Sequence, residues 1–219
     1  LPSQKRIGWH GIASSEYAKK LDLIAVMKED VLSIIDDRGQ VIRTVDGVRS
    51  IRKKDENIYY VKKNGTEYGL YKLEKSSDIP FFQSRYERLS AFQLSEHNYL
   101  VLEFAAGQYM VNFSNVAKNF QMKLQNTSGV EITGFVDSPI QIGNDQIFLN
   151  LIVKTAPKDR SKVEVWYGND NRIVEHTYKN DVENAFALWN PYTNKIVKLK
   201  GQEVTHFFPI GNERYLLAF

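Results

Sequence analysis

The sequence contains no cysteine, which excludes disulfide frameworks, zinc knuckles, thiol nucleophiles and redox pairs. It also has no apolar run long enough to form a membrane-spanning helix, so we expect no membrane insertion. The polar opening, residues 1–6, does not have the pattern of a signal peptide. The sequence also has no large excess of charge of either sign. The 29 basic and 26 acidic residues leave a formal net charge of +3, too balanced for the basic field of a nucleic-acid-binding protein, so we expect no nucleic-acid partner.

Aromatic residues are abundant, with 12 Tyr, 12 Phe and 3 Trp in 219 residues. From residue 21 onward, short apolar bursts alternate with Gly, Asn, Asp and Lys clusters, a pattern typical of strands and hairpins. The segments Asp37-Arg38-Gly39 and Lys63-Asn64-Gly65 are predicted hairpin tips, because glycine there supplies the positive φ of a tight turn. Residues 14–21 could form one short helix capped by serine, and a helix and a non-helical structure are equally compatible with them. The composition favours an all-β protein.

One segment recurs along the chain with a period of about 40 residues, as in propellers. Residues 51–61 align without a gap with residues 92–102, and further copies lie at 140–149 and 208–217. Each copy has the pattern of a strand end, a polar turn and an antiparallel strand buried on both faces. The buried strands begin around Ile58, Tyr99, Ile147 and Tyr215. The last interval is the longest, and it contains a polar stretch at 168–184 that we interpret as an insertion.

Four antiparallel strands in each repeat predict a β-propeller, either partial or small. The expected blades cover residues 48–83, 88–125 and 130–200, with half-blades at 21–46 and 203–219. The half-blades could complete each other in a small closed disc, or the chain could be one slice of a larger propeller. An aromatic-rich β-sandwich is the alternative fold.

No catalytic pattern is present. The strained G-x-S-x-G elbow of a serine hydrolase is missing, and no serine has two flanking glycines. The serines considered are Ser14, Ser15, Ser76, Ser77, Ser114 and Ser128. The histidines His10, His97, His176 and His206 are scattered singly, and we interpret them as turn or surface residues. We therefore predict no catalytic residue, no cofactor-binding residue and no metal ligand.

Several weaker signals remain. The paired acids 29–30, 36–37 and 55–56 fit turn tips better than calcium ligands, and residues 169–171 lack the later bidentate acid of a calcium loop. A basic cluster could meet an anion or a partner, or could be a solvated blade rim; it consists of Arg49, Arg52, Lys53, Lys54, Lys62 and Lys63. Possible glycosylation sequons occur at Asn64, Asn112 and Asn126. The tryptophans Trp9, Trp166 and Trp189 are more typical of core or inter-blade packing than of ligand stacking.

Residues 162–170, with the strand-like Val163-Glu164-Val165-Trp166, are followed by a polar linker and by apolar segments at 187–189 and 196–199. This arrangement resembles the N-terminal propeller of bacterial prolyl oligopeptidase-family serine peptidases. The best match covers residues 163–219, and the rest agrees only in its repeats. In that family the propeller covers an α/β-hydrolase domain that holds the catalytic residues. No hydrolase portion is present in this sequence, so the resemblance implies a non-catalytic module that gates or positions peptide substrate.

Two functions stay open. The first is the gating module, in which we expect the strands around Ile58, Tyr99, Ile147 and Tyr215 to line the disc. Its partner would be an α/β-hydrolase domain or the remaining blades. The second is a stand-alone bacterial propeller that binds a glycan, peptide or protein partner through its loops. Under either hypothesis we expect a periplasmic or extracellular location. The resemblance does not identify any ligand-binding residue in this sequence.

Overall fold

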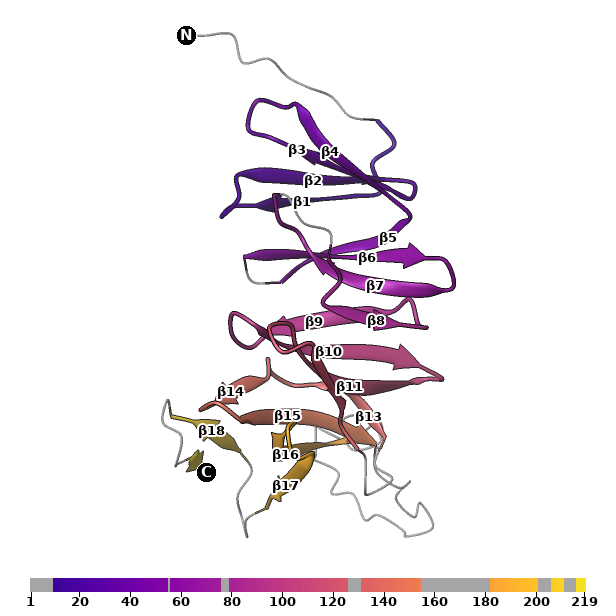
Figure 1. The fold of residues 1–219 in the computed structure, drawn as a ribbon. Helices are drawn as coiled ribbons and strands as arrows, with labels where there is room; N and C mark the ends of the chain where they lie inside the picture. Colours follow the sequence, from indigo (N-terminus) through magenta and orange to yellow (C-terminus); the bar gives the residue numbers. More distant parts are fainter. Residues whose placement is uncertain are drawn as a thin grey trace, which may run out of the picture. The chain divides into compact units, whose positions relative to one another are not determined.

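The computed structural model describes residues 10–54, 56–75, 79–125, 131–154, 182–200, 206–210 and 216–219. All regular elements in these ranges are β-strands (Figure 1), which confirms the all-β prediction. No helix in the described part of the chain is long and apolar enough to cross a membrane. The chain divides into two compact units, residues 1–105 with 111–121, and residues 106–110 with 122–219.

The first sheet is a four-stranded antiparallel meander in the order β1-β2-β3-β4. Its strands are β1 (Ser14–Ala18), β2 (Leu23–Lys28), β3 (Val31–Ile35) and β4 (Val41–Asp46). The predicted tip before β4 is confirmed, because Gly39 has a φ of 78° and the Asp36 carboxylate accepts hydrogen bonds from the backbone N–H of Arg38 and of Gln40. The acidic pair at residues 36–37 therefore lies at a turn tip, as predicted, and the Asp36 side chain stabilises that turn.

This sheet decides between the two structures that the sequence allowed near its start. Residues 14–18 form a strand and not a helix, and this strand pairs with the strands of residues 21–46 in one four-stranded sheet. Burial alternates along the strand from Ser14 to Ala18, as a two-residue period requires. Pairing with β2, from Ser14 opposite Met27 to Ala18 opposite Leu23, satisfies the backbone and outweighs a local serine cap.

The second and third sheets repeat the meander. The second has the order β5-β6-β7-β8, with β5 (Val48–Lys54), β6 (Asn57–Asn64), β7 (Glu67–Lys72) and β8 (Phe82–Ser84). The third has the order β12-β11-β10-β9, with β9 (Leu89–Gln93), β10 (Asn98–Ala105), β11 (Gln108–Asn115) and β12 (Phe120–Lys123). The tip predicted at residues 63–65 is confirmed, since Gly65 opens the turn between β6 and β7 with a φ of 63°.

In the first unit the sheets lie face to face in chain order (Figure 1), and β6 shows why. Ile58 and Tyr60 pack into one apolar cluster with the first sheet. Tyr59 and Val61, on the opposite face of the same strand, pack into a second cluster with β9 and β10. A strand that is buried on both faces carries a nearly continuous apolar run, as the repeat predicted.

The repeat copies fall at equivalent places. Ile58, Tyr99 and Ile147 are each the second residue of a long buried strand, while Tyr215 lies outside the described residues. These strands are interior to their sheets, with a neighbour on each side. The expectation that they line the centre of a disc is therefore wrong, because only an edge strand can line a channel.

The second unit contains a sheet in the order β13-β15-β16-β17, with β14 also paired to β15. Its strands are β13 (Ile132–Phe135), β14 (Ile140–Ile142), β15 (Gln146–Lys154), β16 (Val182–Asn190) and β17 (Lys195–Leu199). A separate pair joins β18 (Phe207–Pro209) to β19 (Leu216–Ala218).

The predicted insertion at 168–184 extends too far. Residues 182–184 open β16 and pair with residues 152–154 of β15, although all three side chains are exposed and two of them, Glu183 and Asn184, are polar. Because residues 182–184 are exposed, this end of β16 lacks the alternating apolar pattern of a strand, and its sequence is similar to that of a loop. The remainder of the insertion and the predicted strand 163–166 lie outside the described residues.

Successive four-stranded antiparallel sheets whose strands follow one another in chain order have the architecture of propeller blades. The fold class is therefore a partial β-propeller, and a sandwich of two sheets does not account for three sheets packed in series in the first unit. The expected bounds of the blades, and the pairing of half-blades, stay predictions.

Candidate functional site

The basic cluster lies on β5, the edge strand of the second sheet, and on the neighbouring strand β6. The register sets Arg52 opposite Tyr59 and Lys54 opposite Asn57, so these two cations leave the same face of the strand. Lys53 is opposite Ile58 and leaves the other face. Because successive side chains of a strand point to opposite faces, the basic residues that are continuous in sequence are distributed over both faces of β5. Only some of them therefore lie on the face toward the third sheet.

A groove of about 260 Å³ opens between β5 and β9, and we call it the β5–β9 groove. Its lining is Ser50, Arg52, Lys53 and Lys54 on β5, Tyr59, Val61 and Leu70 behind them, and Leu89, Ser90, Ala91 and Phe92 on β9. The floor residues Tyr59, Val61, Leu70, Leu89 and Ala91 are buried members of the core between the two sheets. The groove is the place where that core opens toward solvent between two edge strands.

The rim of the groove is cationic. The Lys54 ammonium lies 4.8 Å from the centre of the Phe92 ring, a cation–π contact that holds the charge over the groove. Arg52 is exposed, and none of the described residues that line the groove carries a carboxylate. The nearby Glu56 is bound to Lys20 at 2.9 Å, and Lys20 holds the pKa of Glu56 below its usual value, with smaller contributions from Lys19 and Lys53. Asp55 lies outside the described residues.

A second, polar pocket of about 330 Å³ lies between the segment after β7 and the end of β11. Burial, followed by the charge of Glu74, raises the pKa of Tyr99 in this pocket. Ser114 lines the same pocket and donates its hydroxyl to the Phe81 carbonyl oxygen at 2.7 Å. This buried serine, one of the candidates from the sequence, thus ties β11 to the segment directly before β8.

A third pocket, of about 440 Å³, contains Glu103 of β10, which is 9% exposed. Its carboxylate accepts hydrogen bonds from the Ser84 hydroxyl and, at 3.3 Å, from the Asn112 side-chain amide. Asn112 itself is buried, so the sequon at this position is not exposed for glycan attachment in the folded sheet. These hydrogen bonds join β8, β10 and β11 at a pocket that is lined by polar residues.

Replacing Glu103 with Ala is expected to lower the free energy of unfolding by about 1–3 kcal/mol, because Ser84 and Asn112 lose their buried acceptor. Urea denaturation followed by circular dichroism measures the change. The control is Glu67→Ala, an exposed residue at the same pocket, for which we expect a change within about 0.5 kcal/mol. Equal effects of the two substitutions would show that the hydrogen bonds of Glu103 do not stabilise the fold.

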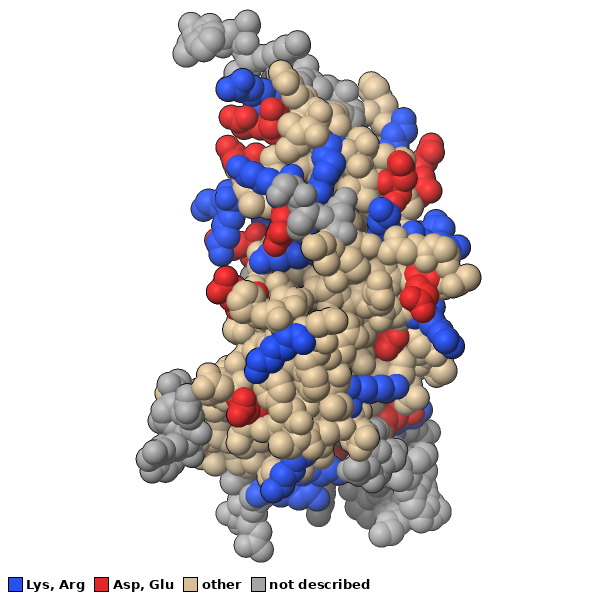
Figure 2. Space-filling view, viewed as in Figure 1, with Lys and Arg blue, Asp and Glu red and all other residues tan. Residues whose placement is uncertain are grey.

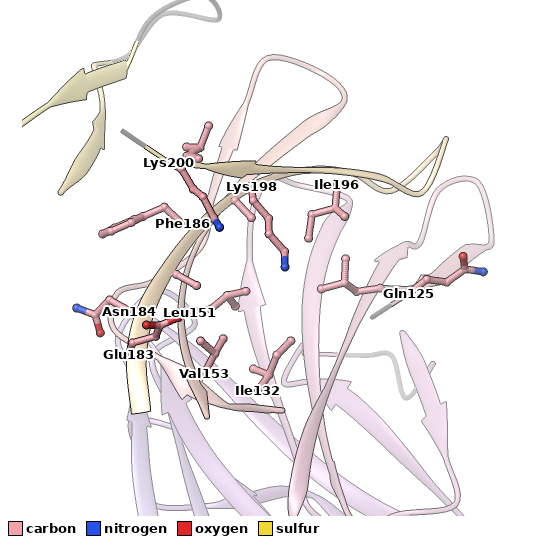
Figure 3. A pocket seen from close by; sticks show the side chains of 14 residues that line it. Gln125, Ile132, Leu151, Val153, Glu183, Asn184, Phe186, Ile196, Lys198 and Lys200 are labelled. Atoms are coloured by element: carbon pink, nitrogen blue, oxygen red, sulfur yellow. The ribbon is translucent and has the colours of Figure 1, made fainter. Parts of the chain in front are cut away.

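The second unit carries an apolar recess of about 170 Å³ on the face of its sheet (Figure 3). Ile132, Leu151, Val153 and Phe186 form much of its surface. Lys198, Lys200 and Glu183 also line it, so charges of both signs are present. The recess offers a packing surface, and no serine, threonine or cysteine is among the described residues that line it.

The remaining candidate residues from the sequence do not gather at one site. His97 lies in the turn between β9 and β10, 3.9 Å from the exposed Glu96 carboxylate, and His206 stacks on Phe208. Ser14 is half-buried on β1, and residues 29–30 form the turn between β2 and β3. In the part of the chain that the structure describes, no three His, Asp or Glu residues form a group that could hold a metal ion. Ser76, Ser77, Ser128, His176, Asn126, Trp9, Trp166 and residues 169–171 lie outside that part.

Sequence reasoning did not find two features of these sites. Glu103 is a single acid in the apolar run Tyr99–Phe104, and an acid in such a run is a signal for a buried, hydrogen-bonded carboxylate. Phe92 and the groove floor gave no local signal, because β5 and β9 are distant in sequence and meet only through packing of sheets.

No protein-family model matches the chain, and no curated protein matches it. Among solved structures it is similar to the β-propeller domain of Myceliophteria thermophila Cps50 (Swd1), at 13% identity and a TM-score of 0.43, over 98% of this chain and 63% of that chain. A eukaryotic initiation factor matches at 10% identity and a TM-score of 0.40, over 97% of this chain and 59% of that one. The tricorn protease matches at 11% identity and a TM-score of 0.40, over 91% of this chain and 18% of the protease. The chain thus spans less than two thirds of each of these proteins, and the assignment of blades rests on its own strand order.

Proposed function

We propose that the chain is a non-catalytic interaction module that binds a peptide segment of another protein or domain. The observation that carries this proposal is the β5–β9 groove, whose floor is made of buried apolar core residues and which lies between two strands that each end a sheet. A strand at a sheet edge has backbone groups that an extended peptide can bind, and an adjoining recess accepts a side chain of that peptide. The groove therefore combines the two elements of peptide recognition.

In its finer form, the proposal is that the module gates or positions peptide for a prolyl oligopeptidase-type hydrolase domain that these residues do not contain. Its support is the resemblance at residues 162–170, 187–189 and 196–199. The alternative is a stand-alone exported bacterial propeller, periplasmic or extracellular, that binds a glycan, peptide or protein. The two forms differ in whether the bound peptide is passed to a hydrolase.

Binding of fluorescein-labelled extended peptides of acidic, neutral and basic composition, measured by anisotropy, tests the proposal. At least one class is expected to bind saturably and to be competed by its unlabelled form. Proline-containing chromogenic peptides are expected to remain uncut. The absence of binding by every class, or turnover that persists through extensive purification, would contradict the proposal.

The gene beyond the codon for Phe219 distinguishes the finer form from its alternative. A G-x-S-x-G elbow encoded within the following few hundred codons is the expected result for the peptidase module. A stop codon directly after Phe219 would favour the stand-alone binder.

A further inference from the structure

We infer that the β5–β9 groove selects an acidic peptide segment in which an apolar side chain lies between carboxylates. This inference rests on the proposed function and names the chemistry of its ligand. The juxtaposition that carries it is an apolar floor beside a rim whose charged side chains, in the described residues, are all cationic.

The floor determines the central residue of the ligand. Tyr59, Val61, Leu70 and Leu89 are each less than 5% exposed and pack against one another. None of Val61, Leu70 and Leu89 has a polar side-chain atom with which to bind a polar group of the ligand. A space of about 260 Å³ over such a floor is suited to one apolar side chain of a partner.

The rim determines the flanking residues. Arg52 and Lys54 are two positions apart on one strand, so both extend along the groove face of β5. Neither forms a salt bridge with another residue that the structure describes. A guanidinium group binds a carboxylate through two parallel hydrogen bonds, and the Lys54 ammonium is held at the rim by Phe92. Two cations on one face of a strand beside an apolar recess are complementary to carboxylates on both sides of an apolar side chain.

The surrounding surface favours a peptide over a nucleic acid. Figure 2 shows acidic side chains interspersed with the basic ones over β1–β7 on the visible face, so this face has no continuous basic field. A nucleic-acid backbone requires a wide basic field, and the net charge of this chain is only +3. Binding of a single-stranded oligonucleotide is therefore an outcome of the test that would contradict the inference.

The test uses anisotropy titrations of the full chain with four labelled probes of equal length. They are a peptide with the core Glu-Leu-Glu-Leu-Glu, its Lys-Leu-Lys-Leu-Lys and Glu-Ser-Glu-Ser-Glu counterparts, and a single-stranded oligonucleotide. The first is expected to bind at least about tenfold more tightly than each of the others. Its affinity is expected to fall as salt concentration rises, because the contacts at the rim are ionic.

Matched variants locate the effect. The double substitution Arg52→Ser with Lys54→Ser is expected to weaken binding of the Glu-Leu peptide at least about tenfold. The control, Arg38→Ser with Lys28→Ser, removes the same charge at exposed positions away from the groove and is expected to change affinity less than about twofold. Equal weakening by both pairs would show that only net charge matters and would overturn the inference.

The probes also separate this inference from the proposed function. If neutral or basic peptides bind as tightly as the acidic one, the module binds peptides but the stated selectivity is wrong. If no peptide binds, the proposed function fails together with the inference. Tighter binding of the oligonucleotide than of any peptide overturns both.

Discussion

Replacing Trp189 with Ala is expected to lower the free energy of unfolding by about 3–5 kcal/mol, the usual cost of removing a large buried aromatic side chain. Trp189 is 0% exposed on β16, where it lies opposite Ile147 of β15 and Ile196 of β17. Its indole N–H donates a hydrogen bond to the Asn194 side-chain oxygen at 3.0 Å. The substitution removes the apolar contacts of the ring and this hydrogen bond together. The interpretation of Trp189 as a core residue is confirmed by this burial.

Urea denaturation followed by far-ultraviolet circular dichroism measures this loss. Trp189→Phe retains an aromatic ring and is expected to have a smaller effect than Trp189→Ala. Val197→Ala, at a 46% exposed position on β17, is the control and is expected to change stability by no more than about 0.5 kcal/mol. A loss below about 1 kcal/mol for Trp189→Ala would contradict the central place of this side chain in the second unit.

Replacing Gly69 with Ala is expected to lower the free energy of unfolding by about 1–3 kcal/mol, because it overpacks the second sheet. The new Cβ would lie 2.7 Å from Cε2 and 2.9 Å from the hydroxyl oxygen of Tyr71. That ring cannot move freely, since it stacks on Tyr60 at 4.9 Å and its hydroxyl accepts a hydrogen bond from the Asn64 amide at 2.7 Å. Relief of the clash would disturb the core between the first two sheets.

The matched control is Gly134→Ala, where the nearest atom to the new Cβ is Ile152 Cδ1 at 3.6 Å, an ordinary contact. We expect this substitution to change stability by no more than about 1 kcal/mol. In a double-mutant cycle, Tyr71→Leu is expected to reduce the cost of Gly69→Ala, because it removes the atoms in conflict. If Gly69→Ala is as well tolerated as Gly134→Ala, the described packing of Tyr71 is wrong.

The sequence was informative wherever a residue's neighbours are close in the chain. The repeat placed Ile58, Tyr99 and Ile147 at the same position of three buried strands because hairpin pairing is local and burial on both faces leaves a continuous apolar run. The turns at Gly39 and Gly65 were predictable because each needs a positive φ that glycine adopts at low cost.

It was misleading where tertiary pairing overrides local pattern. Residues 14–18 carry a serine cap signal and yet pair as β1, and residues 182–184 are exposed and yet continue β16. The candidate site likewise combines residues that the sequence identified with residues that only tertiary packing brings together. Arg52 and Lys54 were identified as part of a basic cluster, whereas the apolar floor and Phe92 depend on the packing of β9 against the second sheet.

Hydrogen–deuterium exchange of the full chain, measured with and without the Glu-Leu peptide, tests most directly the claim that this module binds peptide between edge strands. In the free chain, amides of the interior strands β6 and β10 are expected to exchange slowly. On addition of the peptide, exchange is expected to slow in β5 and β9 and to stay unchanged in β16. Protection confined to β16 or to the first sheet, with no change in β5 and β9, would contradict the account.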